Sequence, residues 1–268
     1  MITTADPLGE FTTSNDLLHD ATQLRDRMAR DGYLFFRGLA PKPRLLELRE
    51  AMLGYCRDAG WLKPDAPLLT GTWGGAGPYG EGDPEYMTIY KQIVQHPLFN
   101  DLPGDPFFLD LIGRLVAGPV LMHRMHIGRI TFPANTTQTT PPHQDWQYIR
   151  GAAATYTIWT PIGDAPVQLG GLKVLRGSHR RGAIEHELKP EQKYAGWGLF
   201  GDRLARTGGD EWLTTDFILG DCLVFHAHTV HAALPNLTSD RLRLSLDNRY
   251  QRQGDETGPA ATHTHYDL

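Results

Sequence analysis

Short strand-like runs separated by turn residues fill the second half of the chain, and this pattern limits the possible folds more than any other feature. Apolar or alternating runs occupy residues 120–132, 153–160, 171–175, 216–218, 222–225 and 242–250. Many short strands broken by turn residues are typical of β-sandwiches and barrels. We therefore expect a mainly β core that extends over about residues 119–252.

The first part of the chain favours helices around one short strand. A first helix is expected to end at Asp31-Gly32, because glycine readily adopts the left-handed conformation that ends a helix. Residues 33–37 predict a strand, and the apolar spacing after Pro43 and over 107–117 predicts helices. No repeat or linker divides the sequence. We therefore expect one domain, residues 1–268, that is mainly β with flanking helices (α+β) and has its helical part over about residues 1–118.

The composition is that of a folded protein and does not point to nucleic acid or a membrane as partner. Hydrophobic residues make up 40% and charged residues 21%, and the net charge is −5, unlike the basic surface of a nucleic-acid binder. No stretch approaches the roughly 20 apolar residues of a membrane span. The first 20 residues do not resemble a signal peptide, and Cys56 and Cys222 fit a reduced pair, so we expect a cytoplasmic protein.

Residues 70–84 are rich in glycine and proline and are expected to form a loop. They include Gly75-Ala-Gly77-Pro-Tyr-Gly80, which matches the G-x-G-x-x-G letters of a dinucleotide-binding turn. That function requires a strand before the motif and a helix that opens directly from it. Other glycines surround this motif and a proline lies inside it, so the sequence predicts a loop and not a nucleotide site.

The first candidate for chemistry is the pair His143 and Asp145. Residues i and i+2 of a strand point to the same face, so these two side chains can reach one metal ion. Such a pair is weak evidence alone, because a surface histidine beside a solvated carboxylate is the commoner arrangement. A second His-x-Asp at residues 265–267 lies in a polar tail without a strand pattern.

A later segment supplies further histidines, His226, His228 and His231, around a buried strand and the start of the next. Two histidines and one carboxylate that leave coordination positions open suit Fe(II) and dioxygen chemistry. Zinc accepts the same ligand types. From proximity alone the third ligand stays open. His123 and His126 have no partnered carboxylate and are not favoured.

Five short pieces occur in one order along the chain, and they are Asp31-Gly32-Tyr33, His143-Gln-Asp145, Gly170–His179, Gly220–His226, and His231–Asn236 followed by Arg243. In their residues, order and spacing they resemble the phytanoyl-CoA dioxygenase-like family of Fe(II)/2-oxoglutarate oxygenases. The resemblance implies a double-stranded β-helix (jelly-roll) core with Fe(II) at one end, 2-oxoglutarate chelating that iron, and O2 as oxidant. It assigns the metal to His143, Asp145 and the last histidine, His231, and leaves His226 as a packing or ligand-orienting residue.

The resemblance also implies a strand arginine that binds the far carboxylate of 2-oxoglutarate. A guanidinium matches a carboxylate with two parallel hydrogen bonds. Arg241, Arg243 and Ser245 alternate on one face of the expected strand, and Leu242 stands where the family carries its arginine, so the sequence departs by one residue. Because Arg243-Leu-Ser245 resembles the R-x-S pair of related oxygenases, we predict Arg243 and Ser245 as this site, with Arg241 as the alternative.

The reaction implied by the resemblance is hydroxylation of a small organic substrate, with release of succinate and CO2. Asp145 argues against halogenation, because related halogenases lack this carboxylate. Desaturation, epoxidation and ring closure stay open, because they depend on how the substrate is placed. The competing interpretations are a zinc- or manganese-dependent jelly-roll enzyme of cupin type and a non-catalytic β-sandwich that binds a small molecule.

Substrate contacts are the part of the site on which the sequence says least. Trp146 and Arg129 are candidate contacts, although a packing role for Trp146 and a surface role for Arg129 are alternatives. We expect residues 70–90 and 185–212 to cover the site, as loops on a rigid barrel often do. Their aromatic residues suggest a partly apolar substrate, and they are Trp73, Tyr79, Tyr86, Trp197 and Phe200.

Overall fold

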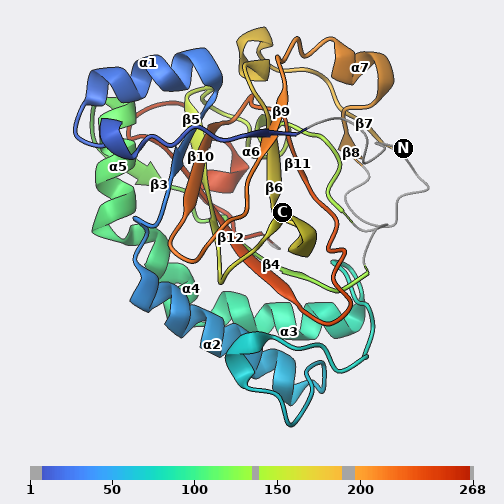
Figure 1. Cartoon of the computed structure of the whole chain (residues 1–268). Coiled ribbons are helices and arrows are strands. Elements are labelled where there is room, and N and C mark those ends of the chain that lie inside the picture. Colours follow the sequence, from blue (N-terminus) through green and yellow to red (C-terminus); the bar gives the residue numbers. More distant parts are fainter. Residues whose placement is uncertain (1–7, 135–138, 189–196, 266–268) are drawn as a thin grey trace.

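The computed structural model describes residues 8–134, 139–188 and 197–265, and in it the helices of the first half wrap around two facing sheets (Figure 1). The helices are α1 (Ala21–Asp31), α2 (Lys42–Asp58), α3 (Pro84–Gln95), α4 (Pro97–Asp101), α5 (Pro106–Val116), α6 (Trp146–Ile149) and α7 (Gly201–Ala205). The strands are β1 (Gly9–Glu10), β2 (Tyr33–Phe36), β3 (Val120–Met122), β4 (Ile127–Thr131), β5 (Thr155–Pro161), β6 (Leu172–Leu175), β7 (Glu187–Leu188), β8 (Trp197–Gly198), β9 (Trp212–Thr214), β10 (Cys222–His226), β11 (His231–Ala233) and β12 (Arg243–Arg252). In the described part of the chain, no helix is long and apolar enough to cross a bilayer.

The strands form the two sheets of a jelly roll. The larger sheet has the order β2-β10-β5-β12-β3, with β4 also paired to β12, and the smaller one has the order β1-β9-β6-β11. The pairings are antiparallel except that β1 runs parallel to β9. The predicted α+β class with a jelly-roll core is confirmed.

Alternation along β2 sends its side chains into two hydrophobic layers. Tyr33 and Phe35 pack between the sheets, where they meet Phe225 from β10. Leu34 and Phe36 point to the other face of the larger sheet, which the helices cover. Because each large apolar side chain contributes roughly 1.5–3 kcal/mol when fully buried, both faces of this sheet stabilise the fold.

Helix α1 shows how the local sequence sets an element's ends. The Asp20 carboxylate accepts hydrogen bonds from two backbone N–H groups of the first turn. Leu24 and Met28 are buried one turn apart and hold the helix against the core. The helix ends at Gly32 with φ of 79°, in the left-handed conformation that was predicted for this glycine.

Several elements differ from expectation. The run 120–132 is two strands, β3 and β4, and residues 216–218 form only a single bridge between Phe217 and Ala165. The helices α3 and α4 follow the loop expected over residues 70–84 and were not predicted; Pro84 and Pro97 stand in the first helical turn, where a missing N–H costs nothing. Strand β2 confirms the strand expected over residues 33–37, whereas β1 was not predicted, and both pair into the sheets.

Strand β12 carries a row of polar residues into the space between the sheets. Leu244, Leu246 and Tyr250 belong to the hydrophobic layer under the helices. The odd-numbered residues of β12 point to the opposite face and are buried, namely Arg243, Ser245, Asp247, Arg249 and Gln251. This inward-facing row supplies one wall of the site described next.

Candidate active site

His143, Asp145 and His231 converge on one point between the sheets. The Nε2 atoms of His143 and His231 each lie 3.7 Å from Oδ1 of Asp145. All three side chains are buried, and one possible ligand atom from each lies within 4.8 Å of the others. In the described residues this is the one group of His, Cys, Asp and Glu side chains arranged closely enough to hold a metal ion.

A short backbone pairing brings the two histidines together. His143 and His231 form an antiparallel bridge, with N···O distances of 3.0 Å in both directions. His231 is the first residue of β11, as expected, but His143 lies outside any regular strand and Asp145 immediately precedes α6. The expectation that strand alternation aligns His143 with Asp145 is therefore wrong; a bridge and a helical turn align them instead.

Backbone carbonyls fix the orientation of both imidazoles. The Nδ1 atom of His143 lies 2.8 Å from the carbonyl oxygen of Pro141, and that of His231 lies 3.1 Å from that of Thr229. A carbonyl only accepts, so each Nδ1 carries the proton and each Nε2 keeps a lone pair toward the shared point. Burial, and to a smaller extent the electrostatic effect of the nearby His143, lowers the pKa of His231 to about 3, so this ring is neutral near pH 7.

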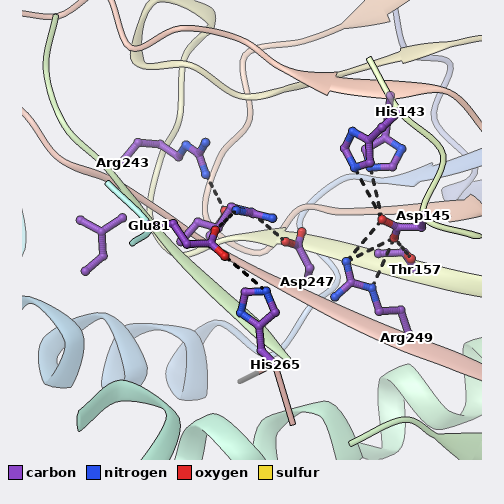
Figure 2. Close-up of polar contacts among 12 residues, drawn as sticks. Glu81, His143, Asp145, Thr157, Arg243, Asp247, Arg249 and His265 are labelled. Atoms are coloured by element: carbon purple, nitrogen blue, oxygen red, sulfur yellow. Dashed lines mark hydrogen bonds and ion pairs between the residues drawn. The ribbon is translucent and has the colours of Figure 1, made fainter. Parts of the chain in front are cut away.

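The carboxylate of Asp145 is held from the side opposite the histidines (Figure 2). Its Oδ2 accepts hydrogen bonds from Thr157 Oγ1 at 2.5 Å and from Arg249 Nε and Nη2 at 3.3 Å. Burial alone would raise the pKa of Asp145, but the positive charge of the Arg249 guanidinium outweighs it and holds that pKa well below its usual range. Asp145 is therefore an anion whose Oδ1 faces the two imidazoles.

A pocket begins at these three side chains and extends along the inner face of β12. Its lining residues are Arg129, Thr140, His143, Asp145, Trp159, Leu172, Phe225, His231, Ala233, Arg243, Asp247 and Arg249. The Arg243 guanidinium is buried in its wall, and Nη1 donates to the Ser245 hydroxyl. Arg243 Nε has no partner among the described residues. Burial, with a smaller effect from Arg129, lowers the pKa of Arg243 to about 10, so it remains a cation at pH 7.

Comparison with known proteins identifies the family. The family model of phytanoyl-CoA dioxygenase (PhyH) matches residues 28–244. The chain belongs to this family. It is therefore a non-haem iron, 2-oxoglutarate-dependent dioxygenase that hydroxylates a small organic molecule, as the resemblance implied.

Curated relatives agree with this assignment, and solved structures share the fold. The chain is 28% identical to a 1-deoxypentalenic acid 11-beta-hydroxylase of Streptomyces arenae and 27% identical to one of Streptomyces exfoliatus, each match covering 96% of this chain and 88% of the relative. The fold is similar to that of the carbocyclase SnoK, with a TM-score of 0.62 and 20% identity over 95% of this chain and 92% of SnoK. It is also similar to the epimerase SnoN in complex with Fe3+ and alpha ketoglutarate, with a TM-score of 0.59 and 22% identity over 90% of this chain and 86% of SnoN.

Arg241, the alternative anchor for 2-oxoglutarate in this PhyH family member, lies outside the pocket. Its side chain is 51% exposed, and its Nε is 3.9 Å from Asp240. Arg243 and Ser245 are both buried on the inner face of β12. Arg241 precedes the first residue of β12, so the alternation that seemed to align it with Arg243 does not extend to it.

The two candidate substrate contacts occupy different environments. Trp146 packs beside a hydrophobic cluster with Ile149, and its Nε1 donates to the carbonyl of Gly151 at 3.3 Å. It is not among the described residues that line the pocket. Arg129, in contrast, is one of the lining residues and forms ion pairs with Glu81 and Asp247.

The other histidines lie outside the pocket lining. His226 and His228 contact each other, with ring centroids 5.2 Å apart, and the backbone N–H of His228 donates to Nδ1 of His226. Gln144, the residue between His143 and Asp145, donates a hydrogen bond to the carbonyl of His228 at 2.7 Å. This bond connects the segment that carries His228 to the metal-facing residues. In the second His-x-Asp, only His265 falls within the described residues.

Of the expected covering segments, only some residues reach the site. Tyr79 and Tyr86 pack with Trp61 in the core beneath the helices, because their rings complete an aromatic cluster there. Glu81, in the same segment, does reach the pocket by its ion pair with Arg129. In the second segment, the carbonyl of Trp197 accepts a hydrogen bond from Tyr148, whose ring lies 5.8 Å from that of His143.

Sequence reasoning missed Arg249, Thr157 and Tyr148. Arg249 lies on the same alternating face of β12 as Arg243, so the period of that strand contained a signal for it. Thr157 is a β5 residue whose role depends on the pairing of β5 with β12. Tyr148 lies one helical turn beyond Asp145 and could be found only from α6.

Proposed function

We propose that His143, Asp145 and His231 hold the Fe(II) of this dioxygenase. The observation that carries this proposal is the arrangement of two imidazole nitrogens and one carboxylate oxygen around a single buried point. Three ligands of these types on one side of a metal leave its remaining positions open, which is the arrangement that suits Fe(II), 2-oxoglutarate and dioxygen. The residues present fit the metal, because each Nδ1 is already bonded to a backbone carbonyl and each Nε2 is available.

Arg243 is the proposed anchor for the far carboxylate of 2-oxoglutarate, with Ser245 beside it. Support comes from the chemistry of the pocket wall: a buried guanidinium with an unpartnered Nε and no ion pair to a described residue. A buried cation of this kind is costly unless it meets an anion. The guanidinium fork and the Ser245 hydroxyl offer that carboxylate several donors.

Bound iron and 2-oxoglutarate supply the oxidising chemistry, in which dioxygen is consumed, 2-oxoglutarate yields succinate and CO2, and one oxygen atom enters the substrate. The residues of the chain position the groups for it. Thr157 and Arg249 hold the Asp145 carboxylate so that Oδ1 faces the histidines. Trp159, Leu172 and Phe225 line the pocket with apolar surface that excludes water.

The curated relatives support hydroxylation as the outcome, over desaturation, epoxidation and ring closure. The relatives that match over most of the chain are named as hydroxylases of 1-deoxypentalenic acid. Asp145 is present, in contrast to related halogenases. The apolar side chains Trp159, Leu172 and Phe225 in the pocket wall support a partly apolar organic substrate.

The experiment that tests this function is a measurement of succinate released from 2-oxoglutarate in the presence of dioxygen and a single added metal. Fe(II) is expected to support succinate formation, and zinc or manganese at the same concentration is not. A cupin-type enzyme would instead need zinc or manganese for its activity. A non-catalytic binding protein would release no succinate with any of these metals, and either result would contradict the proposal.

We also propose that residues 1–268 act as one cytoplasmic oxygenase domain, without nucleic acid or a membrane as partner. Strands β1 and β2 support the single domain, because they pair into both sheets from the N-terminal part. The net charge of −5 supports a small-molecule substrate over nucleic acid. Two buried free cysteines are consistent with a reducing compartment.

A further inference from the structure

Arg129 differs from the other arginines of the pocket in its access to solvent. Its side chain is 28% exposed, whereas Arg243 and Arg249 are 3% and 5% exposed as residues. Arg243 is the proposed partner of 2-oxoglutarate, and Arg249 is paired with Asp145. Arg129 is therefore the cation that stands at the open side of the pocket.

The two acidic partners of Arg129 hold it loosely. Glu81 Oε2 lies 3.2 Å from Nη1, and Asp247 Oδ2 lies 3.4 Å from Nε. Each contact uses one oxygen and one nitrogen, and both exceed the roughly 2.7–2.9 Å of a tight charge-assisted hydrogen bond. The guanidinium fork is thus not taken up by a bidentate carboxylate from the described residues.

Glu81 and Asp247 differ in how firmly they are placed. Asp247 lies on β12, is buried and is fixed by that strand's pairing with β4 and β5. Glu81 lies in the loop before α3, and its side chain is 37% exposed. Its other oxygen is 3.5 Å from His265 Nε2, and burial lowers the pKa of His265 to about 4, so this ring is neutral near pH 7. Figure 2 shows Glu81 beside His265, with the Asp247 carboxylate on the side toward Asp145.

The pocket that Arg129 shares with the metal-facing residues has apolar as well as charged side chains in its wall. Trp159, Leu172 and Phe225 line the pocket. Tyr148 lies against the metal-facing His143, with ring centroids 5.8 Å apart. Its hydroxyl donates to the carbonyl oxygen of Trp197, and these two side chains are 41% and 44% exposed.

From this geometry we propose that the substrate is an apolar molecule with a carboxylate, that the Arg129 fork binds this carboxylate, and that the substrate displaces Glu81 from Arg129. This inference rests on the proposed function, because it places the substrate beside the iron. The exchange replaces one carboxylate with another and leaves the charge around Arg129 unchanged. A bidentate pair would replace a single long contact. Asp247 remains paired with Arg129 both before and after the substrate binds.

The test uses the full chain loaded with Fe(II) and 2-oxoglutarate without oxygen, and two probes of the same shape, adamantane-1-carboxylate and adamantane-1-carboxamide. Binding of 2-oxoglutarate is measured first by calorimetry, and each probe is then titrated. We expect the loaded wild-type protein to bind the carboxylate at least about tenfold more tightly than the amide. Arg129→Gln should remove this preference and leave the affinities for the amide and for 2-oxoglutarate within about twofold.

Three further variants separate the possible roles of the pair. Glu81→Gln removes the competing carboxylate and should strengthen carboxylate binding severalfold. Arg129→Lys keeps the charge beside Asp247 but loses the fork, so it should retain the fold and lose most of the preference. Arg124→Gln changes an exposed arginine in the preceding segment and should behave as wild type.

Several outcomes would overturn the inference. Absence of carboxylate binding, or equal binding of the two probes, would exclude an anion site at Arg129. A loss of 2-oxoglutarate affinity in Arg129→Gln would assign Arg129 to that ligand instead. If Glu81→Gln and Arg129→Gln weakened binding of the carboxylate probe equally, the ion pair would serve only to hold the loop before α3 in place. In each case normal loading of the wild type with Fe(II) and 2-oxoglutarate leaves the proposed function intact, whereas failure of that loading would contradict the function itself.

Discussion

The guanidinium of Arg249 lies against the carboxylate of Asp145, with Nη2 3.3 Å from Oδ2 and 3.4 Å from Oδ1. This contact connects the long strand β12 to the turn before α6, and both residues are buried. The same strand carries Arg243, so one element of the larger sheet supports both the metal-facing carboxylate and the proposed 2-oxoglutarate anchor.

Arg249→Gln should weaken binding of Fe(II) by about 10–100-fold, because residues that orient a metal ligand typically contribute that much. Without the guanidinium, Asp145 keeps only the Thr157 hydroxyl as a described donor on Oδ2. The measurement is an anaerobic Fe(II) titration. Arg252→Gln, at the exposed end of the same strand, is the matched control and should leave the affinity unchanged. Equal affinities in wild type and Arg249→Gln would contradict this role.

Arg243→Gln should raise the dissociation constant of 2-oxoglutarate by about 10–100-fold, because a hydrogen bond to a charged group contributes roughly 1.5–3 kcal/mol. Arg241→Gln should change it by less than about twofold, because that side chain is exposed and outside the pocket. Calorimetric titration of the Fe(II)-loaded protein without oxygen gives both values. A larger rise of the 2-oxoglutarate dissociation constant in Arg241→Gln than in Arg243→Gln would assign the 2-oxoglutarate anchor to Arg241.

The apo-protein should lose stability as the pH falls from 7 toward 4. Burial lowers the pKa values of His123 and His126 to about 4 and that of His226 to about 3. The unfolded chain takes up these protons near pH 6.5, so the stability from the neutral imidazoles is present above that pH and is lost below it. Urea unfolding should show a loss of at least about 2 kcal/mol between pH 7 and pH 5. A flat profile would contradict the burial of these rings.

Cys56 and Cys222 should not react with a thiol reagent in the folded protein. Both are buried and free, and burial raises the pKa of Cys56 to about 12 and raises that of Cys222 as well, so neither forms a thiolate near neutral pH. Spectrophotometric labelling should be slow without denaturant and should reach both thiols in urea. Rapid labelling of the native protein would show that one of them is accessible.

The sequence predicted the elements that have a strong period and missed those that depend on tertiary pairing. The strand over 33–36 is a continuous aromatic and apolar run, and the one over 243–252 largely alternates, so both were predicted from the sequence. The short strand β9 lies in a polar segment and forms because β6 and β1 flank it. Helices α3 and α4 begin at prolines, which are compatible with a helix start as well as with a loop.

The same division applies to the site. His143, Asp145 and His231 could be grouped because a family resemblance linked two distant segments, although the bridge that aligns them could not be foreseen from strand alternation. The environment of Arg129 depends on Glu81, which comes from a loop distant in sequence. No local pattern contains such a contact, because it arises only when α3 and β4 pack together.

The most direct test of the central claim is the metal requirement of succinate release in two histidine variants of one segment. His231→Ala should abolish both stoichiometric Fe(II) binding and succinate release from 2-oxoglutarate, because the metal would lose one of its three ligands. His228→Ala, three positions earlier and outside the pocket lining, should retain both. Succinate release that persists in His231→Ala, or that disappears in His228→Ala while His231→Ala stays active, would contradict the account.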